Sequence, residues 1–147
     1  MIRQASRQDI RTVSLLARQL WPEHTLFELE AEYASLLSSD ACAVFLFIEQ
    51  SQPAAFAQCQ LRRDYVEGTH GSPVGYLEGV YVEPEYRRQG IAAELLRRCE
   101  QWAKAKGCAE FASDCELHNT DSLHFHLHAG FTEANRVICF TKKIGEK

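Results

Sequence analysis

Residues 87–92 carry a pattern suited to holding a phosphate: Arg87-Arg88-Gln89-Gly90-Ile91-Ala92. The pattern follows an apolar stretch of strand length and opens a segment with helical periodicity. Free amides at the start of a helix attract anions, and Gly90 lets a pyrophosphate approach the backbone because it has no Cβ. The two familiar phosphate motifs, G-x-x-x-x-G-K-[ST] and G-x-G-x-x-G, are absent. From spacing alone, a plain helix start with solvated arginines is the simpler interpretation.

A carboxylate that could take part in proton transfer, Glu78, lies in the middle of an apolar strand-like segment. Alternation along this segment predicts that Glu78 shares a face with Tyr76, Val80 and Val82, with Leu77 and Tyr81 on the other face. A half-buried carboxylate needs a partner. An ion pair with a nearby arginine is the ordinary explanation for such a residue.

Four histidines cluster at positions 118, 124, 126 and 128. His124 and His128 would share one face of a helix, a spacing that can hold one edge of a metal ion. No glutamate follows the first of the two and no third ligand is evident, so H-E-x-x-H chemistry is excluded. We expect no metal site here.

The elements that must position these residues follow from hydrophobic periodicity and from turn residues. Their predicted order is strand 2–5, a helix from Ser6 to Trp21, helix 26–37, strands 42–49, 54–66 and 74–82, helix 89–106, strand 108–115, helix 120–129 and strand 136–142. The helical crossover before strand 108–115 indicates a mixed sheet. We therefore predict an α/β (α+β) fold. Because no linker-like break occurs, we predict a single domain over residues 1–147.

Composition limits the partners and the compartment. Lys and Arg total 16 against 20 for Asp and Glu, which gives a net charge of −4. That sign disfavours a nucleic-acid backbone and weakly favours a cationic partner. The six cysteines form no C-x-x-C pair, lie in or beside apolar stretches and follow no apolar leader. They predict buried, reduced thiols in a cytoplasmic protein. No apolar run approaches 18 residues, so we expect no membrane span.

Several motifs carry a resemblance to a known family. Residues 87–92 resemble the R/Q-x-x-G-x-G/A signature of the Gcn5-related N-acetyltransferases, and Asn119 with the later Gly130-Phe131 resembles the Asn…G-F segment of that family. From about residue 20 onward the chain resembles the aminoglycoside 6'-N-acetyltransferases more closely. The motifs that carry this are Leu20-Trp21-Pro22, Arg62-Arg63-Asp64-Tyr65-Val66-Glu67-Gly68-Thr69, Ser72-Pro73-Val74, Leu77-Glu78-Gly79, Ala112-Ser113-Asp114 and Gly130-Phe131.

The resemblance implies a mixed central sheet, flanked by helices and splayed between its fourth and fifth strands, with acetyl-CoA in the gap as co-substrate. Backbone groups of Val80 and Val82 would pair with the pantetheine amides in the manner of an added strand. Asn119 would bond to the pantetheine arm, whereas without the family it is a helix cap. The implied cofactor-binding residues are Val80, Tyr81, Val82, Arg87, Arg88, Gln89, Gly90, Ile91, Ala92, Ala93 and Asn119.

On the substrate side, the resemblance implies that Glu78 binds the substrate amine or helps to deprotonate it, since acyl transfer needs a neutral amine. Asp114 would bind an ammonium group, although a turn or capping role is its ordinary explanation. Trp21 and Tyr65 would stack on sugar rings. For Trp21 the ordinary explanation is a core residue at a helix end.

Two positions depart from the family pattern. His126 stands where many members have a tyrosine that protonates the leaving thiolate. A histidine could do the same work, or it could be a surface helix residue. Asn135 stands where related enzymes often have a substrate-binding glutamate, so this contact would lose its charge. His24 and Glu23 are further candidate substrate contacts.

The function implied is direct acetyl transfer from acetyl-CoA to the 6'-amine of an aminoglycoside. A backbone amide of the stretch from Val80 to Val82 would polarise the thioester carbonyl. The alternatives are the same fold acting on a polyamine, another small amine or a protein N-terminus, and a binding module that senses acetyl-CoA without turnover. The resemblance also implies a homodimer formed through the C-terminal strand region.

Overall fold

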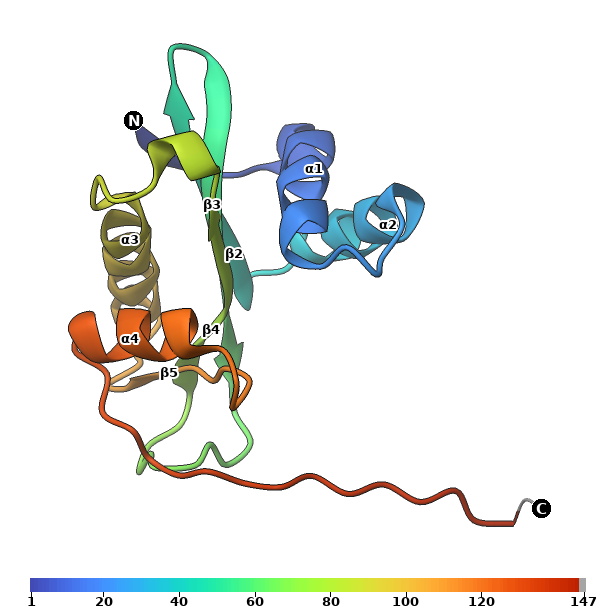
Figure 1. The fold of residues 1–147 in the computed structure, drawn as a ribbon, viewed down its shortest axis with the longest axis vertical. Coiled ribbons are helices and arrows are strands. Elements are labelled where there is room, and N and C mark those ends of the chain that lie inside the picture. The colour runs from blue at the N-terminus through green and yellow to red at the C-terminus, as the bar shows by residue number, and fades with distance from the viewer. Residues whose placement is uncertain (146–147) are drawn as a thin grey trace. The chain divides into compact units, whose positions relative to one another are not determined.

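The computed structural model describes residues 1–145 (Figure 1). Its internal contacts divide the chain into two compact units, Met1–Asp114 and Cys115–Lys147. No helix within the described residues is long and apolar enough to cross a membrane.

The first unit is built on a five-stranded mixed sheet with its strands in chain order. The strands are β1 (Ile2–Gln4), β2 (Cys42–Glu49), β3 (Gln52–Arg62), β4 (Val74–Val82) and β5 (Phe111–Ala112). Neighbouring strands run antiparallel from β1 to β4, and β5 runs parallel to β4. The parallel pair requires a crossover, which is supplied by the helix between the two strands. The predicted mixed fold is confirmed.

Helices cover both faces of this sheet. Figure 1 shows α1 (Ile10–Leu20) and α2 (Leu26–Leu36) on one side and α3 (Ile91–Ala105) on the other. Short 3-10 turns, η1 (Arg7–Asp9) and η2 (Pro84–Tyr86), precede α1 and follow β4. Each helix buries one apolar face, as its periodicity predicts.

The core beneath α1 and α2 fixes the position of this helical pair on the sheet. Val13, Leu29 and Tyr33 from the helices pack with Leu46 and Phe56 from the strands. The Tyr33 hydroxyl, buried deep in this cluster, is hydrogen-bonded to the Gln58 amide oxygen at 2.5 Å. A buried polar group costs free energy unless it is paired, so this bond satisfies both side chains and connects α2 to β3 within the core.

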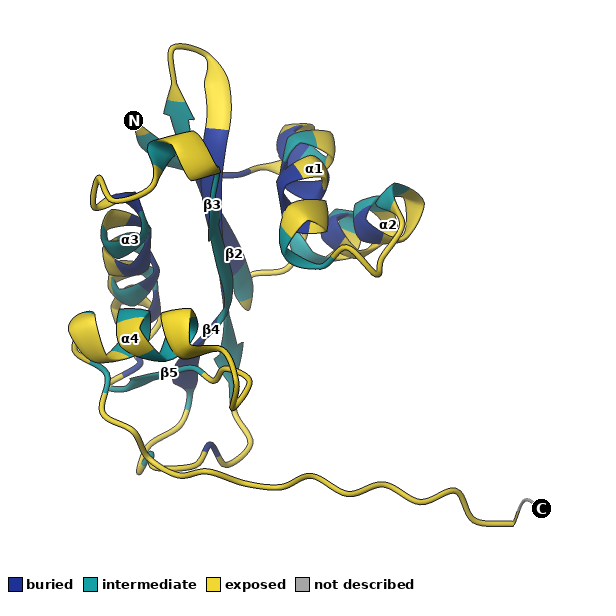
Figure 2. Cartoon of the chain, in the orientation of Figure 1, coloured by how far each residue is buried: buried dark blue, intermediate teal, exposed yellow. Residues whose placement is uncertain are grey.

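The second unit holds one helix, α4 (Thr120–His128), followed by an extended segment. Residues 131–145 contain neither helix nor strand, and their side chains are mostly exposed (Figure 2). The strand predicted at 136–142 is therefore wrong for this structure. A strand exists only with a neighbour, and the ladders of residues 1–145 include none for this segment.

Other sequence predictions also need correction. The strand predicted at 108–115 shortens to β5, and the one predicted at 54–66 begins earlier, at Gln52, and ends at Arg62. The cysteines are all free, but they are not all buried, because Cys115 and Cys139 are exposed.

Candidate functional site

A β-bulge lies at the centre of the candidate site. Gln58 pairs with Gly79 and Cys59 pairs with Leu77, which leaves Glu78 as the extra residue of β4. Such a bulge bends the strand locally and turns a side chain to a new direction. Here the residue that is turned is the carboxylate singled out from the sequence.

The bulge also reverses the phase of β4. Tyr76 and Tyr81 are five residues apart, yet they lie on the same face of the sheet, because they pair with β3 residues only four apart. Tyr81 packs against the core beneath α1 and α2, whereas Tyr76 belongs to a separate small cluster. The prediction that Tyr81 lies on the face opposite Tyr76 is therefore wrong. Val80 and Val82 consequently lie on the opposite face, which α3 covers. The face predicted to be common to Tyr76, Glu78, Val80 and Val82 is therefore wrong beyond the bulge.

The same reversal turns backbone groups outward. The Glu83 amide donates to the Ala54 carbonyl at 2.8 Å, which makes the neighbouring pair of Val82 with Ala55 a non-hydrogen-bonded pair. The N–H and C=O groups of Val82, and two residues earlier those of Val80, therefore point away from β3. Without the bulge, they would point into the ladder.

The edge toward which these groups point is open in the first unit. β5 pairs with β4 only through Gly75 and Tyr76, and the Ser113 hydroxyl then donates to the Leu77 carbonyl at 3.3 Å. Beyond Leu77 no strand pairs with this edge of β4 within residues 1–145. The predicted splay between the fourth and fifth strands is confirmed.

The turn that follows β4 presents backbone amides at the start of α3. Arg88 and Gly90 have φ angles of 64° and 80°, so two residues in the left-handed region lie close together, a backbone geometry that occurs in anion-binding turns. Nothing lies within 4 Å of the point where a Cβ of Gly90 would stand. Arg87 fixes the turn, because its Nε donates to the Val82 carbonyl at 2.8 Å. A pyrophosphate-binding role for this turn stays a prediction.

Glu78 is ion-paired, as its ordinary explanation requires. The Arg62 Nη2 atom lies 3.3 Å from one carboxylate oxygen of Glu78 and 3.0 Å from the other. The Glu78 side chain nevertheless remains 21% exposed and that of Arg62 38% exposed. The pair therefore lies at the surface of the site, where a further cation can reach the carboxylate.

Asp114 is connected to the same arginine through a tyrosine. The Tyr76 hydroxyl donates to Asp114 Oδ2, and the Arg62 guanidinium carbon lies 3.4 Å from the centre of the Tyr76 ring. Burial, with Asp114 adding to it, raises the pKa of Tyr76, so the hydroxyl keeps its proton and acts as a donor. Sequence reasoning missed the part played by Arg62 and Tyr76. The alternating pattern of the two segments predicts that Arg62 and Tyr76 lie on strands. It does not predict how the two strands align, because the alignment depends on the bulge.

Trp21 packs directly against the strand that carries Glu78. A Cβ at Gly79 would lie 2.8 Å from two atoms of the indole, so only glycine allows this approach. The indole also meets the Phe56 ring edge-on, with 6.2 Å between ring centres. Trp21 is thus anchored in the core, as its ordinary explanation states, while it remains partly exposed beside Glu78.

The other predicted substrate contacts in this unit lie at the surface. Tyr65 is 76% exposed, and its hydroxyl donates to Glu67 at 3.1 Å. His24 is exposed, and its Nε2 lies 3.6 Å from a carboxylate oxygen of Glu23. The structure thus joins Glu78 to Asp114 through a network and sets Trp21 beside Glu78. For Tyr65, His24 and Glu23 a substrate role stays a prediction.

The second unit carries three predicted site residues. Asn119 caps α4, because its Oδ1 accepts from the Ser122 amide at 3.1 Å. His126 Nδ1 lies 2.6 Å from the Ser122 carbonyl, a geometry in which Nδ1 carries the proton. Asn135 accepts from the Arg136 amide at 2.8 Å. Roles for Asn119, His126 and Asn135 in acyl transfer stay predictions.

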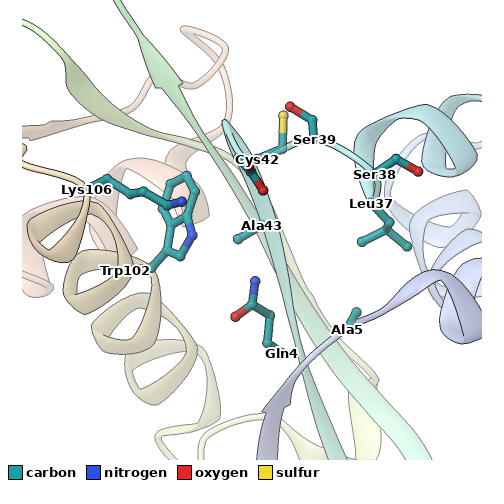
Figure 3. Close-up of a pocket in the computed structure, with 10 residues that line it drawn as sticks. Gln4, Ala5, Leu37, Ser38, Ser39, Cys42, Ala43, Trp102 and Lys106 are labelled. Atoms are coloured by element: carbon teal, nitrogen blue, oxygen red, sulfur yellow. The ribbon is translucent and has the colours of Figure 1, made fainter.

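Two further features bear on ligands. No cluster of three or more metal-ligating side chains occurs within residues 1–145. A cavity of about 180 Å³ lies along the outer edge of β2, with Trp102 and Lys106 on one side and Leu37 and Ser38 on the other (Figure 3). None of the predicted site residues lines it.

Comparisons with known proteins agree with the geometry. Residues 8–131 match the model of the acetyltransferase (GNAT) family. An aminoglycoside N(6')-acetyltransferase type 1 from Acinetobacter genomosp. 13 is 42% identical over 88% of this chain and 89% of its own length. The protein of the same name from Salmonella typhimurium is 37% identical over 97% and 98%.

Solved structures are similar over nearly the whole chain. One is AAC(6')-Iy in complex with the bisubstrate analogue CoA-S-monomethyl-acetylneamine, with a TM-score of 0.93, 36% identity and 97% coverage of both chains. Another is the aminoglycoside 6'-N-acetyltransferase AAC(6')-Ih from Acinetobacter baumannii, with a TM-score of 0.91, 39% identity and 99% coverage of both chains.

Proposed function

We propose that this chain, which belongs to the acetyltransferase (GNAT) family, transfers the acetyl group of acetyl-CoA to the 6'-amine of aminoglycosides. The observation that carries the proposal is the bulge of β4. The bulge leaves the Glu78 carboxylate partly exposed, and it turns the backbone groups of Val80 and Val82 outward along the same strand. The names and the bound ligand of the relatives supply the substrate class.

The residues of the first unit fit the co-substrate. The outward-facing groups of Val80 and Val82 would pair with the amides of pantetheine, and the amides that begin α3 would hold the pyrophosphate. Acetyl-CoA supplies the acetyl group as a thioester. The absence of a Cβ at Gly90 leaves room for the phosphate oxygens.

Glu78 would act on the amine that receives the acetyl group. An ammonium group cannot attack a carbonyl, so the Glu78 carboxylate accepts its proton, directly or through one water molecule. The neutral nitrogen then attacks the thioester carbonyl, a C–N bond forms, and the C–S bond breaks. A backbone amide at the open edge of β4 would donate to the carbonyl oxygen as negative charge develops there.

Asp114 and Trp21 would orient the substrate. Asp114 is exposed and carries a charge opposite to that of an ammonium group. Trp21 offers a flat face beside Glu78 on which a sugar ring can stack. His126 is the candidate donor of a proton to the departing thiolate. Because Nδ1 would keep its proton against the Ser122 carbonyl, the donor would have to be the imidazolium, which gives up its Nε2 proton and leaves the neutral Nδ1–H form.

We also propose that the chain forms a homodimer through its C-terminal segment. Val137, Ile138 and Phe140 are apolar, and Phe140 is 89% exposed. Exposed apolar side chains on an extended segment can be buried against a second copy of the chain. The resemblance to the family points to the same assembly.

A panel of amines tests the activity. We expect release of free CoA thiol with aminoglycosides that carry a 6'-amino group and none with analogues that carry a 6'-hydroxyl, because the hydroxyl presents no amine to the thioester. Thiol release with polyamines or a peptide N-terminus alone would favour the alternative substrates. No release with any amine, despite acetyl-CoA binding, would contradict the enzyme assignment.

Substitution of the two carboxylates tests the site. We expect Glu78→Ala to lower kcat/KM for the aminoglycoside by about 10² to 10⁴, the range typical of general acid–base groups. We expect Asp114→Ala to raise the KM for the aminoglycoside, because it removes a charge that would hold an ammonium group. Glu85→Ala is the matched control, because Glu85 is an exposed carboxylate of the same region that contributes to the turn η2. Equal effects at all three positions, in steady-state assays, would refute the assignment.

Light scattering coupled to size exclusion tests the dimer. We expect a mass twice that of the 16.7 kDa chain for the wild type and a shift toward the monomer for Phe140→Asp, because a charge on this surface opposes its burial. Phe27→Asp is the matched control, since Phe27 is also an exposed aromatic residue but lies on α2. A monomeric wild type would contradict this part of the proposal.

A further inference from the structure

One guanidinium links the two carboxylates to which we assign the substrate. Arg62 contacts Glu78 through Nη2 and lies over the ring of Tyr76, whose hydroxyl donates to Asp114. We infer that Arg62 is a positioning residue for acetyl transfer: with Tyr76 it fixes both acidic side chains in the orientation that receives the substrate's ammonium groups. This inference rests on the proposed function and deepens it.

The form of the ion pair supports this role. Arginine usually binds a carboxylate with two nitrogens, each on its own oxygen. Here a single nitrogen, Nη2, bridges both oxygens of Glu78, while Nε is buried and has no hydrogen-bond partner among the described residues. A carboxylate has about four acceptor sites, so most of the Glu78 acceptor capacity remains available to another donor. Arg62 therefore holds Glu78 without saturating it.

The position of the arginine is fixed from two sides. Arg62 is the last residue of β3 and pairs with Val74, at the start of the strand that carries Glu78. Its guanidinium carbon is 3.4 Å from the centre of the Tyr76 ring, close enough for the flat faces of the two groups to be in contact. Stacking restricts rotation of the long side chain, so the direction from which Nη2 approaches Glu78 is restricted as well.

Tyr76 carries the same constraint to Asp114. Its ring is buried, whereas Asp114 is exposed and follows the short strand β5. An exposed aspartate would otherwise sample several rotamers, and the Tyr76 hydroxyl selects one of them. The four side chains thus form a chain of contacts from Glu78 through Arg62 and Tyr76 to Asp114.

A double-mutant cycle tests whether Arg62 acts through Glu78. We expect Arg62→Met, which keeps a long stem but removes the charge and the planar head, to lower kcat/KM for the aminoglycoside about tenfold to a hundredfold, as small misplacements do. The KM for acetyl-CoA should stay within about twofold, because Arg62 lies outside the open edge of β4. In a Glu78→Gln background, Arg62→Met should lose most of its effect on kcat/KM, and the part that remains should be the part that acts through Tyr76 and Asp114.

A second cycle tests the branch to Asp114. Tyr76→Phe keeps the ring under Arg62 and removes only the hydroxyl. We expect it to raise the KM for the aminoglycoside in the wild type and to have no further effect in an Asp114→Asn background. An effect of equal size in both backgrounds would show that the hydroxyl supports the fold instead, and would remove Tyr76 from the inference.

Controls separate positioning from folding. Arg11→Met breaks an exposed ion pair with Glu30 on the helical pair and should leave kcat/KM unchanged. If Arg62→Met unfolds early in a thermal melt, Arg62→Lys carries the test, since it keeps the charge without the planar head and should recover only part of the activity. Two outcomes with an active wild type would overturn this inference alone. In the first, the Arg62 variants keep the wild-type kcat/KM; in the second, Arg62→Met lowers kcat/KM by the same factor in the wild type and in the Glu78→Gln background. An inactive wild type would overturn the proposed function and this role together.

Discussion

The slip of one residue between β3 and β4 is the constraint on which the site depends. Gln58 and Cys59 are neighbours on β3, but their partners Gly79 and Leu77 are separated by Glu78. This extra residue does two things at once. It turns a carboxylate toward Arg62, and it rotates every later backbone group of β4 by half a period, so that those of Val80 and Val82 point away from β3. The proposed substrate and co-substrate contacts thus share one structural cause.

The distribution of charge follows from the same arrangement. The net charge of −4 is small, and it hides a separation between two carboxylates near the middle of the sheet, Glu78 and Asp114, and two arginines in the turn after β4. Glu78 and Asp114 lie where a cationic substrate is expected, whereas Arg87 and Arg88 adjoin the amides where an anionic co-substrate is expected. Arg62 is the exception, a cation on the acidic side, and its contacts explain its presence: it orders the two carboxylates rather than neutralising them.

Much of the fold could be predicted from the sequence, because the elements have strong local patterns. The continuous apolar run of β2 and the helical spacing of apolar residues in α1 and α3 are visible in the sequence, because each element buries those residues. The phase of β4 could not be predicted this way, since a bulge depends on the register with another strand and leaves no period of its own. A glycine within a strand can mark a bulge or a close approach, and the reason for Gly79, the close approach of Trp21, is a tertiary contact that the sequence does not show. The prediction of a strand at 136–142 was wrong for a related reason: strand propensity is a local property, and it does not show whether a neighbouring strand is there to pair with.

The most direct measurement is amide hydrogen exchange, resolved by residue, with and without CoA. The account predicts that exchange at Val80 and Val82 slows by about tenfold or more when CoA binds, since their amides gain acceptors at the open edge. Exchange at Tyr81, which pairs with Phe56 across the ladder, should change little. If CoA binds, as shown by slower exchange at Gly90 and Ile91, and yet Val80 and Val82 are unaffected, the central role given to the bulge is contradicted.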